Sequence, residues 1–252
     1  LNMYNGENKY TYNVDVKYKK DDMYRVSLIN TVNNHEQIIL RNEEGVYVLT
    51  PSLNKSFKFQ SDWPYNNSQV YILGRILSDI DSDEDKKYEL KDNMHIYTTK
   101  VEYSTNTELV KQNIYFDDNY ILKRVEVYND KEELAMEFNV NNFEDNCNID
   151  DDIFILDRNL SEDTKDVSKT IEDVVYPMYL PNNTYLTSES KMEKEDGERI
   201  ILTFGGEKPF TLIEETITVG KELDLNLTYG EPGIIIDTVG SIDDYNINWL
   251  SN

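Results

Sequence analysis

Cysteine, histidine and basic residues are all scarce in this 252-residue chain. The single cysteine, Cys147, excludes an intrachain disulfide, and the acidic residues beside it disfavour a reactive thiolate. The two histidines, His35 and His95, belong to no HExxH motif, and no GxSxG motif or Cys–His pair occurs at a known motif spacing. We therefore expect no catalytic residues and predict that the protein is not an enzyme.

Positive charge is the second shortage, because 25 basic residues face 49 acidic ones and the net charge is −24. Such a charge repels phosphates, so it opposes nucleic acid as a partner and disfavours docking on an anionic membrane surface. Because the chain has 49 acidic residues, two carboxylates at the spacing found in glycosidases would not distinguish a glycosidase from any other protein. No run of 18 apolar residues occurs, so no segment is expected to span a membrane.

Cofactor and metal motifs are also missing. There is no glycine-rich nucleotide loop, and we expect no cofactor. The acidic run Asp81–Asp85 resembles the start of a calcium loop, but Lys86 stands where an EF-hand needs glycine and Asp92 where it needs a bidentate glutamate. A solvated acidic loop is the better interpretation, and no metal site is expected.

The sequence is rich in aromatic residues and contains segments in which apolar and polar residues alternate. Hydrophobic residues make up 38% of the chain and 19 residues are tyrosine, which is too rich for a disordered protein. In 12–18, YNVDVKY, and in 134–140, LAMEFNV, apolar and polar residues alternate as in half-buried strands. Similar segments at 24–29, 37–40, 46–50, 94–103, 110–116 and 121–128 predict an antiparallel sheet.

One helix interrupts these strands. From Ser68 onward, apolar residues recur at three- and four-residue spacings through Ile80, and Asn66 or Asn67 can cap the first turn. We expect this helix to pack across the concave face of the sheet. Trp63, just before it, is either a hydrophobic plug or the rim of a cavity or interface. Trp249, in a second alternating stretch, is expected in the core.

The chain divides by composition into three parts. Residues 1–145 form the first β domain, and residues 146–173 form an acidic linker that contains a short apolar anchor at 153–156. Residues 174–252 form a small β-rich domain, with strands expected at 199–204, 210–219, 223–228 and 234–237.

The segment 45–64, GVYVLTPSLNKSFKFQSDWP, followed by an apolar helix, resembles the LolA-like lipoprotein-carrier superfamily. Together with YRVSLIN at 24–30, NNHEQIIL at 33–40 and residues 112–116, it is similar to germination lipoproteins of the GerS type from Clostridia. The C-terminal part, with YPMYLP at 176–181 and TFGGEKPFTLIEE at 203–215, resembles a β domain that follows LolA-like domains. The implied fold is a half-open antiparallel barrel closed by helices and followed by a second β-rich domain.

The resemblance implies a non-enzymatic envelope lipoprotein that binds another protein and supports spore formation and germination. The implied partner is a spore-cortex N-acetylmuramoyl-L-alanine amidase. The alternatives are a carrier that holds an acyl chain or lipoprotein in the half-barrel, and an envelope sensor. The implied location is outside the cytoplasm, with membrane attachment only through an N-terminal lipid anchor beyond these residues. The candidate cavity or partner-binding residues are Phe57, Phe59, Trp63, Tyr65, Tyr71, Leu73 and Leu77.

Overall fold

The computed structural model describes residues 1–20, 22–104, 106–160, 167–169, 174–177, 179–194, 197–219, 224–235 and 238–250. The chain forms two compact units. Unit 1 contains Leu1–Leu160 and Asp224–Asn252, and unit 2 contains Ser161–Leu223. Each unit is described separately below.

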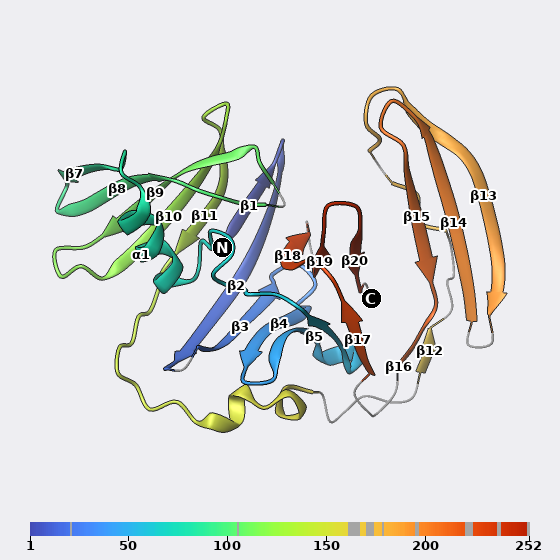
Figure 1. Ribbon diagram of the computed structural model, residues 1–252, viewed down its shortest axis with the longest axis horizontal. Coiled ribbons are helices and arrows are strands. Elements are labelled where there is room, and N and C mark those ends of the chain that lie inside the picture. Colours follow the sequence, from blue (N-terminus) through green and yellow to red (C-terminus); the bar gives the residue numbers. More distant parts are fainter. Residues whose placement is uncertain are drawn as a thin grey trace. The chain divides into compact units, whose positions relative to one another are not determined.

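Unit 1 is built on one 12-stranded sheet with the order β17-β6-β5-β4-β3-β2-β1-β11-β10-β9-β8-β7 (Figure 1). Its members are β1 (Asn2–Asn5), β2 (Asn8–Lys19), β3 (Met23–Asn30), β4 (Glu36–Asn42), β5 (Gly45–Thr50), β6 (Lys55–Phe59), β7 (Lys87–Lys91), β8 (Met94–Lys100), β9 (Leu109–Phe116), β10 (Leu122–Asn129), β11 (Leu134–Asn139) and β17 (Asp224–Thr228). The prediction of a mainly β protein with a large open sheet is confirmed.

The sheet is antiparallel except at one end. There, β17 runs parallel to β6, with Leu225 beside Ser56 and Leu227 beside Lys58. The last strands, β18 (Glu231–Ile235), β19 (Thr238–Ile242) and β20 (Ile247–Trp249), form a separate three-stranded antiparallel sheet. The C-terminal segment therefore completes unit 1, which differs from the expected division at residue 174. The division into domains at 1–145, 146–173 and 174–252 remains a prediction.

The main core lies on the inner face of the sheet, which we define as the face that contacts α1 (Leu73–Ser82). Alternate residues of neighbouring strands share this face, such as Tyr12 of β2, Val26 of β3 and Ile39 of β4. Ile76 of α1 and Val239 of β19 belong to the same cluster, so α1 and the small C-terminal sheet both help to cover this face.

The opposite, outer face has its own cover over β4 and β5. Two short 3-10 helices, η2 (Asp151–Phe154) and η3 (Leu156–Asn159), follow one another there, while a third, η1 (Pro51–Leu53), follows β5. Phe154 is buried against Ile38, Leu40, Tyr47 and Leu49, and Ile153 and Leu156 pack around it. The segment expected to be an acidic linker is thus folded against unit 1 as far as Leu160. Its remainder at 161–166 and 170–173 lies outside the described residues.

Unit 2 is also β structure. Its three-stranded sheet has the order β13 (Thr184–Lys194), β14 (Gly197–Gly206) and β15 (Phe210–Glu215), all antiparallel. A second pair joins β12 (Val167–Lys169) to β16 (Ile217–Val219). Ile200, Leu202 and Phe204 of β14 are buried, and Phe204 stacks on Phe210 with ring centroids 4.4 Å apart.

Two local expectations need correction. The helix begins at Leu73 rather than near Ser68, and side chains at the expected start bond to another segment instead. Asn67 accepts a hydrogen bond from the backbone N–H of Ser104, and the hydroxyl of Ser68 accepts one from Glu102. Trp249 was expected in the core but is 41% exposed, because β20 is the edge strand of its sheet.

Candidate partner-binding surface

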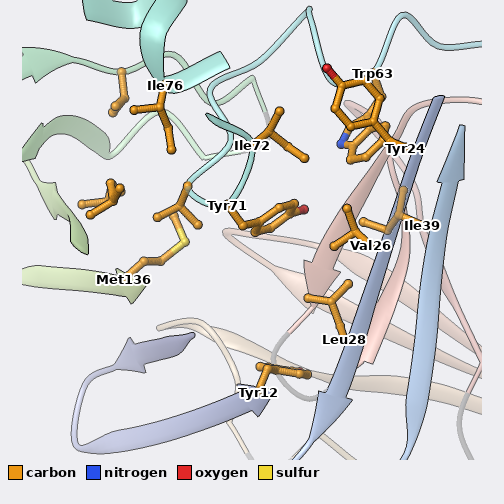
Figure 2. Close-up of a cluster of buried hydrophobic side chains, with 14 of the residues drawn as sticks. Tyr12, Tyr24, Val26, Leu28, Ile39, Trp63, Tyr71, Ile72, Ile76 and Met136 are labelled. Carbon is orange, nitrogen blue, oxygen red and sulfur yellow. The ribbon is translucent and has the colours of Figure 1, made fainter. Parts of the chain in front are cut away.

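The segment 60–72 crosses the inner face between β6 and α1 and fills it with large side chains (Figure 2). Trp63 is completely buried, and its ring meets that of Tyr24 edge-on with centroids 5.9 Å apart. Its backbone carbonyl accepts a hydrogen bond of 2.5 Å from Arg41. Of the two interpretations of Trp63, the structure supports the hydrophobic plug.

The candidate residues from the sequence do not form one surface. Tyr71 and Phe59 are buried in the same cluster as Trp63, and Phe57 and Leu73 are partly buried against it. Tyr65 and Leu77 are 42% and 47% exposed. Five of the seven therefore serve the packed interior, and a surface for a partner has to be sought elsewhere.

A buried polar network fastens α1 to the sheet. Asp79 forms an ion pair of 2.8 Å with Arg75 one turn earlier and accepts a hydrogen bond of 3.0 Å from Gln112 of β9. Gln112 also donates to the hydroxyl of Thr99 at 3.1 Å. Burial raises the pKa of Asp79, and its attraction to Arg75 opposes that rise. The sequence did not predict this network, because Gln112 and Thr99 lie far along the chain from Arg75 and Asp79.

Another buried polar side chain holds the C-terminal sheet. The amide of Gln37 donates to the carbonyl of Val239 at 2.8 Å and accepts hydrogen bonds from the backbone N–H of Val239 and the hydroxyl of Thr238. Strand β20 pairs with β19 only at Gly240–Ile242, so Val239 lies just beyond that pairing. The side-chain amide of Gln37 thus supplies the hydrogen-bond partners for the backbone of Val239 that a longer β20 would have provided.

The inner face becomes exposed at the β7 end of the sheet. We define the β7 platform as Tyr88, Leu90, His95, Tyr97 and Tyr120. His95 stacks on Tyr120 with centroids 4.2 Å apart, and the hydroxyl of Tyr88 lies 2.9 Å from the Nδ1 atom of His95. Tyr88, Tyr120 and Leu90 are 53%, 61% and 63% exposed. These side chains continue the apolar face of the core into solvent.

On the outer face of the same strands lies an open depression of about 460 Å³. Arg124 stacks on the Tyr115 ring at 4.2 Å, and its Nε atom lies 3.3 Å from Glu126. Lys123 pairs with Asp117 at 3.1 Å. The full lining is Glu89, Lys91, Asp92, Met94, Ile96, Tyr115, Lys123, Arg124 and Asn139. This lining combines three cationic side chains, Lys91, Lys123 and Arg124, with two acidic ones, Glu89 and Asp92.

Sequence reasoning did not predict β7 as a strand or the platform as a cluster. The sequence feature that could have predicted this strand is the alternation in Lys87–Lys91, where Tyr88 and Leu90 separate charged residues. Among the described residues, no three metal-ligating side chains come together. None of the helices in the described ranges is both long and apolar enough to cross a bilayer.

Comparison with known proteins places the chain in a family. No protein-family model matches it. The curated sporulation protein YdcC of Bacillus subtilis (strain 168) is 37% identical over 250 residues, which are 97% of this chain and 74% of that protein. The chain belongs to the YdcC family of sporulation proteins.

Similarity to solved structures is weaker. A chain in the complex of the CwlD amidase from Clostridioides difficile with the GerS lipoprotein matches with 16% identity and a TM-score of 0.40, over 57% of this chain and 81% of that one. The MucA/MucB complex of Pseudomonas aeruginosa matches with 13% identity and a TM-score of 0.37, over 94% and 78%. At these TM-scores neither similarity supports a functional argument.

Proposed function

We propose that this YdcC-family protein acts in sporulation as a non-catalytic partner of another protein. The observation that carries the proposal is the 37% identity to a sporulation protein along nearly the whole chain. The finer proposal is that it is an extracytoplasmic lipoprotein with a LolA-like fold, and that its partner is a spore-cortex N-acetylmuramoyl-L-alanine amidase. This finer part rests on the sequence resemblance of segments 24–40 and 45–64 to germination lipoproteins.

The packing of unit 1 favours a protein partner over a carried lipid. An acyl chain needs a continuous apolar groove, because each buried methylene contributes only about 0.8 kcal/mol. On the inner face, Trp63, Tyr71 and Ile72 already occupy the space above β3. Apolar surface is instead exposed at the β7 platform, where a macromolecule can reach it.

Deletion of the gene in its own bacterium tests the proposal. If the protein supports a cortex amidase, the deletion strain should form cortex peptidoglycan without muramic lactam, and the tagged protein should co-purify with the amidase. The matched control is the same strain complemented with the wild-type gene. A deletion strain with normal sporulation and normal cortex would overturn the proposed function.

The carrier alternative makes a different prediction. A carrier purified from cells should bring acyl chains with it, which mass spectrometry of the intact protein would detect. A sample free of lipid, with no binding of a fluorescent fatty-acid probe, would agree with the packed inner face.

A further inference from the structure

Strand β7 is a free edge of the 12-stranded sheet, and all five of its residues are exposed. It pairs with β8 through a hairpin whose two turn residues, Asp92 and Asn93, have φ values of 52° and 60°. Residues that flank such a two-residue turn form a hydrogen-bonded pair, and the pairs then alternate. Tyr88 and Leu90 therefore direct their backbone N–H and C=O groups away from β8.

The two faces of this edge differ in chemistry. On the inner face, Tyr88 lies opposite Tyr97 and Leu90 lies opposite His95, so both belong to the β7 platform. The rings of Tyr88 and Tyr97 are 5.2 Å apart and form an apolar shelf. On the outer face, Lys87, Glu89 and Lys91 point the other way, and Glu89 and Lys91 line the outer depression beside Arg124.

We propose that β7 is the docking edge for an extended strand of the protein partner, whose side chains alternate between apolar and acidic. This inference rests on the proposed function and specifies the surface that it would use. The partner strand adds to the sheet by backbone hydrogen bonds with Tyr88 and Leu90. Its apolar side chains cover the β7 platform, and its acidic side chains meet Lys87 and Lys91.

Charge gives the edge its selectivity. Lysines on an edge strand discourage pairing with another basic or uncharged strand, and they favour an acidic one. The outer face of β7 carries two lysines and one acid, Glu89, in a chain whose net charge is −24, so this face is more basic than the chain as a whole. Acidic side chains of the partner would lie opposite Lys87 and Lys91, with an uncharged residue opposite Glu89. The depression beside this edge leaves room for acidic side chains that extend past β7.

The probe is the peptide Ac-Thr-Glu-Val-Thr-Val-Glu-Thr-NH2, which reads the same in both directions and so fits either strand orientation. Binding to the full chain is followed by ¹⁵N–¹H NMR, which detects weak binding and locates it. We expect shifts confined to the amides of β7 and its neighbours. The control peptide has both glutamates replaced by lysine and should bind at least about tenfold more weakly, and the difference should shrink at high salt.

Two variants test the mode of binding. Leu90→Pro removes an outward-facing N–H without removing a bond to β8, so the fold is retained and peptide affinity should fall at least tenfold. The double variant Lys87→Glu with Lys91→Glu should lose the glutamate peptide and gain the lysine peptide. A misfolded protein would not gain affinity for the lysine peptide, so this result separates a change in charge from a loss of fold. Circular dichroism and thermal unfolding confirm the fold of each variant.

Three biophysical results would overturn the proposal. The first is peptide binding that neither variant changes, and the second is a set of shifts away from β7. The third is a wild-type dimer, seen by analytical ultracentrifugation, that Leu90→Pro abolishes, since this would assign the edge to a second copy. If the variants still co-purify with the cellular partner and restore sporulation, the proposed function stands and only the docking edge is refuted.

Discussion

Replacement of Gln37 should loosen the C-terminal sheet from the rest of unit 1. Gln37 is 3% exposed and its amide bonds to both backbone polar groups of Val239. In Gln37→Ala, those two groups remain buried without a partner. Each such group costs about 1 to 3 kcal/mol, so the free energy of unfolding should fall by about 2 to 6 kcal/mol. That is a large fraction of the roughly 5 to 15 kcal/mol of a typical domain.

Urea unfolding followed by far-ultraviolet circular dichroism and tryptophan fluorescence measures this loss. Trp63 is buried in the main core and Trp249 is on β20, so Trp249→Phe in the background separates the two fluorescence signals. The matched control is Gln60→Ala, because Gln60 has the same side chain but is exposed. It should change the free energy of unfolding by less than about 0.5 kcal/mol.

A third variant separates lost volume from lost hydrogen bonds. Gln37→Leu nearly preserves the size of the side chain but cannot bond to Val239. If the hydrogen bonds matter most, this variant should lose nearly as much stability as Gln37→Ala. A loss below about 1 kcal/mol in both variants, less than the cost of one unpaired buried group, would refute the reasoning.

Three further predictions concern the helix and the covered outer face. Burial raises the folded-state pKa of Asp79 above its ordinary 3.8, so the folded protein holds this proton more tightly than the unfolded chain does. The free energy of unfolding of the wild type, relative to that of Asp79→Asn, should therefore fall as pH rises through the raised pKa and then level off. Urea unfolding at a series of pH values measures this difference. Gly74→Ala should stabilise the protein by up to about 1 kcal/mol in thermal unfolding, because the added methyl group would meet its nearest neighbour, the Tyr24 hydroxyl, at 3.8 Å; destabilisation would show that the helix cannot accept it. Phe154→Ala should cost about 3 to 5 kcal/mol in urea unfolding, whereas Ile155→Ala, 47% exposed, should cost far less; equal losses would contradict the packing of this segment.

The sequence predicted strands best where one face of a strand is buried. In β2 and β11 the alternation of apolar and polar residues identified the inner face, and residues such as Tyr12 and Met136 are buried there. It failed at β7, where Tyr88 and Leu90 alternate with charged residues over only five positions and the strand is exposed on both faces. The start of α1 was misplaced because Asn67 and Ser68 bond to a distant segment, which local capping rules do not consider.

Long-range pairing was the other feature that local patterns could not reveal. The parallel contact of β17 with β6 joins residues more than 160 positions apart, and nothing in either strand specifies its neighbour. Likewise, Gln37 is one polar residue in a strand until β19 comes to lie beside it. The candidate cavity or partner-binding residues Phe59, Trp63 and Tyr71 are buried in the main core, and the sequence alone does not separate a buried aromatic residue from one that lines a binding surface.

The distribution of cover over the large sheet explains why recognition is best sought at one end of it. At β4 and β5, the inner face packs into the main core and the outer face is covered by η2 and η3. At β7, Tyr88 and Leu90 stay exposed on one face, and Lys87, Glu89 and Lys91 stay exposed on the other. Exposed apolar surface of this kind is costly for a monomer to keep without a use. The part of the sheet around β4 and β5, which is covered on both faces, can therefore hold β7 in place as a fixed edge. A partner strand would bind to β7 without any rearrangement of the sheet.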